Sequence, residues 1–115
     1  MENKINTKIY LTRTMDKNSC IFPLTQEASD FLQQMGLKSG SEVFVDIRRK
    51  RYGVEVKVIG SLASILVEGK SRLQVRVWPE GTQAILERGF EDLEEVEITL
   101  TPLKAEGRFF KKGDE

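Results

Sequence analysis

The chain has no histidine and only one cysteine among its 115 residues. Without histidine it lacks the usual general base, the usual nitrogen ligand of metal sites and a member of the Ser and Cys catalytic triads. Cys20 has no partner for an internal disulfide, and one cysteine without histidine does not build a structural zinc site. These absences predict a reduced protein that is not an enzyme and that uses no metal and no cofactor.

Long apolar runs and a net charge are also missing. No stretch approaches the roughly 20 apolar residues that span a bilayer, and the N-terminus is polar rather than signal-like. We therefore expect a cytoplasmic protein with no membrane partner. Lysine and arginine together number 18, as do aspartate and glutamate, so any nucleic acid must be met by a local patch rather than by a global positive field.

What the sequence contains is enough for one globular domain. A chain with 39% hydrophobic and 31% charged residues can bury a single core. We expect residues 1–6 to form an N-terminal tail and residues 7–103 to form the domain. Residues 104–115 are charged and contain glycine, which predicts a C-terminal tail.

Alternating apolar residues and helix-boundary residues predict a mixed α+β chain. Strands are predicted at 8–13, 20–22, 42–47, 54–58, 73–77 and 96–100. Helices are predicted over 26–35, with Thr25 as N-cap, and over 82–88, and a glycine follows each helix directly. Residues 61–67 fit both a short helix and a buried strand, and their pattern does not decide between the two.

The order strand, proline, helix, glycine, strand occurs twice. An offset of 53 residues aligns residues 14–57 with residues 67–110 without a gap, and eleven apolar positions coincide. Any two strand–helix–strand stretches align partly in this way, so an unrelated pair of halves is the alternative. With duplication, the fold is a small pseudo-symmetric β-barrel of the α+β class, built from two strand–helix–strand repeats with two short helices.

The first half contains Ile-Phe-Pro at 21–23, Met-Gly-Leu at 35–37 and Glu-Val-Phe-Val at 42–45. This order resembles the SpoVT/AbrB-type swapped-hairpin unit, in which a strand ends in proline, a short helix ends in Leu-Gly-Leu, and a glycine precedes a Val-x-Val strand. The second half echoes it with Val-Trp-Pro at 77–79 and Glu-Val-Glu-Ile at 95–98.

The AbrB-like pattern implies DNA binding, as a transcription regulator or an antitoxin-like repressor. Arg13 and Lys17 occupy the strand-to-turn position that resembles the DNA-contacting part of that unit. The chain departs from the family where the spacing from Pro23 to Gly36 is longer and where Leu93 replaces the second turn glycine. Related DNA-binding pseudobarrels, including the B3-like fold, would give a similar pattern.

A second, partial resemblance is to the phosphocarrier protein HPr. It is carried by Val-Glu-Val-Lys at 54–57, by residues 61–67 and by Leu-Gln-Val-Arg-Val at 73–77. The phosphorylated histidine has no counterpart, and Val58 stands where the regulatory serine would fall. This resemblance implies an HPr-like domain without phosphocarrier activity, acting as a protein-interaction or adaptor domain of a larger complex.

One concentrated basic segment lies between two predicted strands. Its residues are Arg48, Arg49, Lys50 and Arg51. A two-stranded ribbon fits the major groove of duplex DNA, and guanidinium groups bind phosphates and guanine edges. We predict that this basic hairpin, with Lys57 on the return strand, is the nucleic-acid site of a non-catalytic DNA-binding module. The alternative is a turn made soluble by its charge, in a protein that binds another protein or a second copy of itself.

Two further charged groups leave alternatives open. Arg72 and Arg76 either extend the basic patch or form the solvent side of a half-exposed sheet. Residues 91–97 are mostly acidic, and complementarity to a basic partner, such as the hairpin of another copy, suits them better than metal binding or acid–base chemistry.

Overall fold

The computed structural model describes residues 4–13, 18–49 and 53–103, with the backbone alone for Arg13. It contains two helices, Gln26–Gln34 (α1) and Pro79–Glu87 (α2). The strands are Lys4–Lys8 (β1), Tyr10–Arg13 (β2), Asn18–Pro23 (β3), Glu42–Arg49 (β4), Glu55–Val67 (β5), Lys70–Val77 (β6) and Glu95–Pro102 (β7). Strand β1 begins inside residues 1–6, which we expected to be a tail, and the expected tail 104–115 lies outside the described residues.

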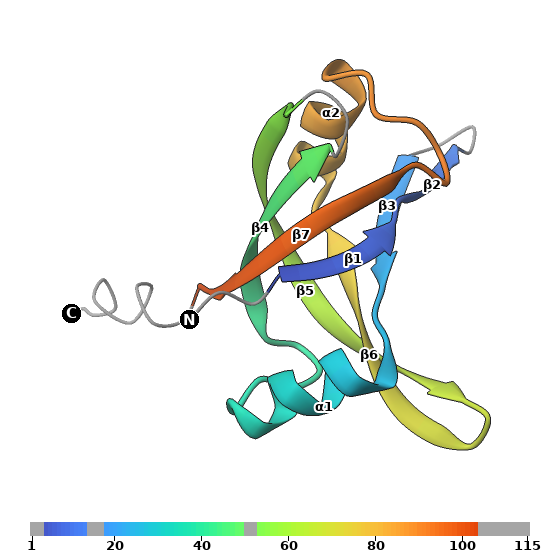
Figure 1. Ribbon diagram of the computed structural model, residues 1–115, viewed down its shortest axis with the longest axis vertical. Helices are drawn as coiled ribbons and strands as arrows, with labels where there is room; N and C mark the ends of the chain where they lie inside the picture. The colour runs from blue at the N-terminus through green and yellow to red at the C-terminus, as the bar shows by residue number, and fades with distance from the viewer. Residues whose placement is uncertain (1–3, 14–17, 50–52, 104–115) are drawn as a thin grey trace.

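All the strands belong to one antiparallel sheet in the order β1-β7-β4-β5-β6-β3-β2. Only Ile9 separates β1 from β2, yet these strands pair at opposite ends of the sheet, Lys8 with Glu95 on β7 and Tyr10 with Ile21 on β3. The N-terminal segment therefore links both edges, and the sheet curls into a barrel with α1 and α2 at opposite ends (Figure 1). The expected α+β barrel is confirmed at this level.

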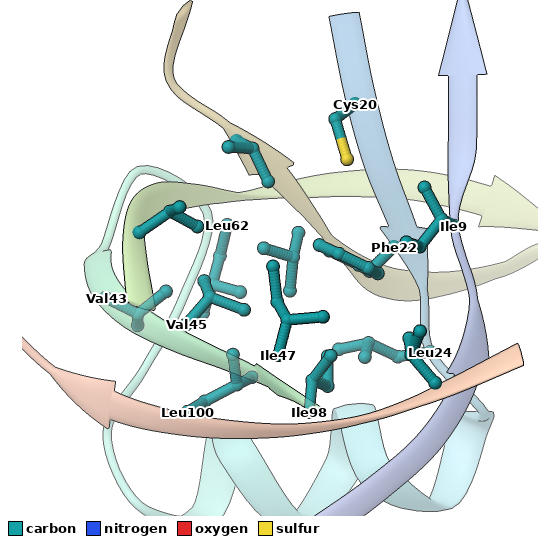
Figure 2. Packing of buried hydrophobic residues seen from close by; sticks show 14 of the residues in the cluster. Ile9, Cys20, Phe22, Leu24, Val43, Val45, Ile47, Leu62, Ile98 and Leu100 are labelled. Carbon is teal, nitrogen blue, oxygen red and sulfur yellow. The ribbon is translucent and has the colours of Figure 1, made fainter. Parts of the chain in front are cut away.

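The core lies inside the curled sheet and is made of side chains at every second strand position (Figure 2). The predicted alternation is confirmed on three strands, whose fully or nearly fully buried residues are Val43, Val45, Ile47, Leu73, Val75, Val77, Val96, Ile98 and Leu100. Phe22 from β3 is completely buried among them. Each such side chain contributes about 1.5–3 kcal/mol through removal of apolar surface from water, so the sheet is held mainly by this core.

Several element boundaries differ from the sequence-based expectation. The strand expected over 8–13 is divided at Ile9 into the end of β1 and the whole of β2. Residues 61–67, which fitted either a helix or a strand, belong to β5, where Leu62 lies opposite Val75 of β6. Helix α2 begins at Pro79 rather than at Thr82. Proline suits the first helical position because its φ is already helical and its missing N–H would have no partner there.

Both helices end as their glycines predict. Gly36 has φ 93° and Gly89 has φ 84°, a left-handed conformation that glycine adopts without steric cost. The amide after each glycine then returns to the last helical turn, Leu37 N to Leu32 O at 3.0 Å and Phe90 N to Ile85 O at 3.4 Å. These turns aim the chain back toward the barrel for the next strand.

Cys20 on β3 is 1% exposed, and burial raises the pKa of its thiol to about 12. The thiolate is the reactive form of cysteine, and a thiol with this pKa stays protonated at neutral pH. Cys20 is therefore a small apolar core residue beside Phe22 and Ile9 (Figure 2).

Gly81 of α2 allows the helix to touch the barrel wall. A Cβ atom at this position would lie 2.7 Å from Val58 Cβ and 2.7 Å from Val77 Cγ1. We predict that Gly81→Ala lowers the free energy of unfolding by about 1–3 kcal/mol, although alanine alone favours a helix by about 1 kcal/mol. Chemical denaturation measures this change. In α1, Ala28→Gly is the matched control and should cost about 1 kcal/mol or less. A stabilised Gly81→Ala variant would show that the close contact does not exist.

Candidate nucleic-acid interface

The predicted basic hairpin is formed by β4 and β5, but its tip is outside the described residues. Lys50 and Arg51 lie outside them, and so does Lys17, which follows β2 in the sequence. Arg13 ends β2 with its backbone opposite Asn18, and its side chain is not described. The structure therefore places three of the seven predicted contact residues with their side chains, namely Arg48, Arg49 and Lys57.

Arg48 lies on the outer face of β4, directly opposite Glu55 on β5. Its Nε donates to Glu55 Oε2 at 2.8 Å, and its Nη2 contacts the same oxygen. The side chains are 54% and 58% exposed. The charge of Arg48 is therefore compensated within its own hairpin, although water still reaches it.

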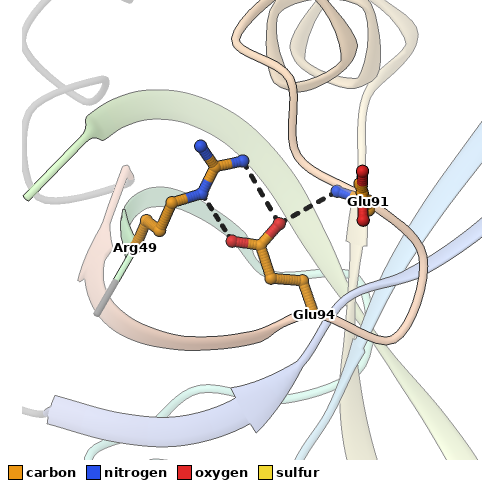
Figure 3. Close-up of polar contacts among 3 residues, drawn as sticks. All are labelled: Arg49, Glu91 and Glu94. Atoms are coloured by element: carbon orange, nitrogen blue, oxygen red, sulfur yellow. Dashed lines mark hydrogen bonds and ion pairs between the residues drawn. The ribbon is translucent and has the colours of Figure 1, made fainter. Parts of the chain in front are cut away.

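Arg49 points the other way and joins the hairpin to the loop between α2 and β7 (Figure 3). Its Nε donates to Glu94 Oε2 at 2.5 Å and its Nη2 to Glu94 Oε1 at 3.2 Å. The guanidinium carbon also lies 4.4 Å from the centre of the Phe90 ring. With side chains only 17% and 21% exposed, this ion pair is a structural link.

The acidic segment 91–97 is thus partly committed to its own chain. Glu94 Oε1 also accepts a bond from the Glu91 amide at 3.0 Å, and Asp92 Oδ1 accepts one from the Leu11 amide at 2.8 Å. We expected this segment to complement a basic partner, and the structure supplies Arg49 of the same chain. Within the described ranges, no three His, Cys, Asp or Glu side chains are grouped to hold a metal ion.

The outer face of β1, β7, β4 and β5 carries charges of both signs. A shallow hollow of about 290 Å³ on this face is lined by Lys4, Asp46, Ile47, Arg48, Glu55, Glu97 and Thr99. Lys57 lies opposite Asp46, with its Nζ 5.5 Å from the centre of the Phe44 ring. Such balanced charge gives little attraction for a polyanion.

A second outer face has a different character. It is formed by β2, β3, β6 and β5, and we call it the arginine face. Its outward side chains form three rows, each crossing neighbouring strands. The first row is Tyr10, Ile21, Arg76 and Ser61. The second is Pro23, Gln74 and Ala63, and the third is Arg72 and Ile65. None of these outward positions is acidic, although Glu42 of β4 lies opposite Ser61, and the Gln26 amide that Arg72 contacts also donates to Asp30 Oδ1 at 3.0 Å.

Neither arginine of this face forms an ion pair with a carboxylate of the described residues. The Arg76 side chain is exposed and forms no hydrogen bond or ion pair with any described residue. Within the described ranges, Arg72 donates to the neutral amide oxygen of Gln26, at 3.3 Å, and to no carboxylate. Two aromatic side chains lie along the row of Arg76. Tyr10, which is 45% exposed, is opposite Ile21, the partner of Arg76 on one side, and the Trp78 indole donates to Oγ of Ser61, the partner on the other side, at 2.9 Å. Positive charge and aromatic surface therefore coincide here.

Comparison with protein-family models, with curated proteins and with solved structures gave no match for the chain. None of the helices in the described part is both long enough and apolar enough to cross a membrane.

Proposed function

We propose that the protein is a non-catalytic DNA-binding module of the transcription-regulator class, and that the arginine face is its principal contact surface. The observation that carries this proposal is the contrast between the two faces. Arg48 and Arg49 are each paired with a carboxylate, whereas Arg72 and Arg76 have none in the part of the chain that the structure describes. A cation that already has a carboxylate partner must lose that interaction before it binds a phosphate, so an unpaired cation contributes more to the free energy of binding a polyanion.

The chemistry of the arginine face suits a nucleic acid in two ways. Guanidinium groups form bidentate bonds with phosphates and with guanine edges. Exposed aromatic rings such as Tyr10 stack on bases, which is a sequence-tolerant contribution in single-stranded DNA. Lys57 lies further along β5, and we assign it, Lys50 and Arg51 to a peripheral role at the hairpin.

We also propose that the barrel arose by internal duplication and that a pseudo-two-fold axis relates its two halves. Loop hydrogen bonds that recur at the offset of 53 residues support it. Ser41 N donates to Lys38 O, as Glu94 N does to Glu91 O. Gly40 N donates to Leu62 O, as Leu93 N does to Ile9 O, and Leu93 has φ 68° where Gly40 has 94°.

A duplicated barrel would not present identical halves to DNA. At the offset of 53 residues, Arg76 corresponds to Pro23 and Arg72 corresponds to Ser19. Both uncompensated arginines of the arginine face therefore come from the second half. For one copy of the chain, this asymmetry favours a contacted sequence that is not itself an inverted repeat.

Fluorescence anisotropy with labelled duplex and single-stranded DNA tests the proposal. We expect binding at low salt that weakens steeply as salt rises, because about 2–4 phosphate contacts release as many counterions. Absence of binding to both DNA forms at low salt would contradict the proposal and would favour the protein-interaction alternative. Binding that ignores salt would also contradict it, since the proposed contacts are electrostatic.

A further inference from the structure

The last part of one edge of β5, residues 63–67, has no partner strand among residues 4–13, 18–49 and 53–103. Strand β4 pairs with β5 from Glu55 to Ser61, and the turn before β4 bonds Leu62 through Gly40 N and Ser41 O, both at 2.8 Å. Beyond Leu62, residues 63–67 pair with β6 alone. The end of the β5–β6 hairpin projects from the barrel, so one side of this strand is open (Figure 1).

The open side carries specific backbone groups. Leu62 turns its N–H and C=O away from β6, and antiparallel pairing repeats this direction at every second residue. Ser64 and Leu66 therefore direct their N–H and C=O groups to the open side, and no described residue bonds them. The Leu66 side chain, which is 78% exposed, lies at the same edge.

Comparable edges nearby are closed by side chains. On β6, the Leu73 amide donates to Ser29 Oγ of α1 at 2.9 Å. On β2, the Leu11 amide donates to the Asp92 carboxylate at 2.8 Å. Proteins usually blunt an exposed edge in this manner, because unpaired backbone groups accept an added strand. The β5 edge, with Ile65, Leu66 and Val67, lacks such a cap among the described residues.

We propose that a second copy of this chain fills this edge, as an antiparallel strand centred on Ile65. In that register Ser64 of one copy faces Leu66 of the other, and each such pair exchanges both of its backbone hydrogen bonds. The side chains on the outer face are then Ile65 opposite Ile65 and Ala63 opposite Val67. Apolar cross-strand pairs of this kind stabilise a sheet, and no like charges are opposed.

Charge complementarity favours a second copy over an unrelated peptide. In this register Glu68 of one copy lies level with Leu62 of the other. Leu62 is bonded to the turn that carries the exposed Lys38, so an acidic residue of one copy and a basic residue of the other lie at the same end of the contact. The contact occurs twice around one two-fold axis, as in other isologous dimers. It leaves the Arg72 and Arg76 positions on the outer faces of the joined sheet.

Oxidative cross-linking of Ile65→Cys tests this register. Facing residues that do not share hydrogen bonds have Cα atoms about 4.5 Å apart, which a disulfide spans. We expect Ile65→Cys to form a covalent dimer that reductant reverses. Ala63→Cys is the matched control. Alone it should form no covalent dimer, because residue 63 faces Val67 of the other copy, and mixed with Val67→Cys it should cross-link. The native Cys20 is buried and should not contribute.

Sedimentation of the unmodified protein at high micromolar concentration gives the second measurement. We expect a monomer–dimer equilibrium that Ile65→Lys shifts to monomer without a change in circular dichroism, since two lysines would then face each other. A monomer at all concentrations, or a dimer in which Ile65→Cys does not cross-link, would overturn the proposal. Both measurements are made without DNA, so their outcome is separate from that of the proposed DNA binding.

Discussion

Replacing Glu94 with glutamine is expected to lower the free energy of unfolding by about 2–3 kcal/mol, because it leaves a partly buried cation without its counter-charge. The Glu94 carboxylate accepts two bonds from Arg49 and one from the Glu91 amide. An amide has only one accepting oxygen, and its NH₂ group would face the guanidinium. Denaturation followed by the fluorescence of Trp78 measures the change.

The matched control is Glu55→Gln, which removes the counter-charge of Arg48. That pair is more than half exposed, so water replaces the lost carboxylate and the change should stay below about 1 kcal/mol. Equal losses in the two variants would contradict the structural role that we assign to Arg49 and Glu94.

Replacing Arg72 and Arg76 together with alanine is expected to weaken binding to DNA by at least tenfold at low salt. The slope of log affinity against log salt concentration should fall by about 2, one for each lost phosphate contact. Both side chains lie on the outer face of β6, away from the core, so the variant should fold. Anisotropy titrations at several salt concentrations provide the measurement.

Arg48→Ala serves as the control for this double variant. It removes one cation from the same chain, but that cation is already paired with Glu55. We expect its effect on affinity to be below about threefold, since an exposed, compensated charge contributes little. If Arg48→Ala weakened binding as strongly as the double variant, the basic hairpin rather than the arginine face would be the contact surface.

Most of the fold follows from local patterns. The alternation at Val43, Val45 and Ile47 predicts a strand with one buried face, because side chains in a strand point to opposite sides in turn. Residues 61–67 were ambiguous because Leu62 and Ser64 continue the inward face of β5 beyond the end of β4, into a hairpin with little core to cover. In this part of β5, apolar and polar residues no longer alternate between the two faces of the strand, so the pattern does not identify a strand.

The site was harder to predict, because charge compensation depends on distant contacts. Arg49 and Glu94 are far apart in sequence, and only the pairing of β4 with β7 brings them together. A run of cations therefore appeared to be one basic patch, although two of its members have carboxylate partners. Arg72 and Arg76 stood out only as outward residues, since the strand order is needed to see that their described neighbours across the sheet are not acidic.

An NMR titration of the labelled protein with duplex DNA at low salt tests directly whether the arginine face binds DNA. We expect a group of amide signals to shift together, because their residues share the arginine face; they are Ile21, Ser61, Ala63, Gln74 and Arg76. The signals of Arg48 and Glu55 should move little. Shifts confined to the basic hairpin, or no shifts at all, would contradict the assignment of DNA binding to the arginine face.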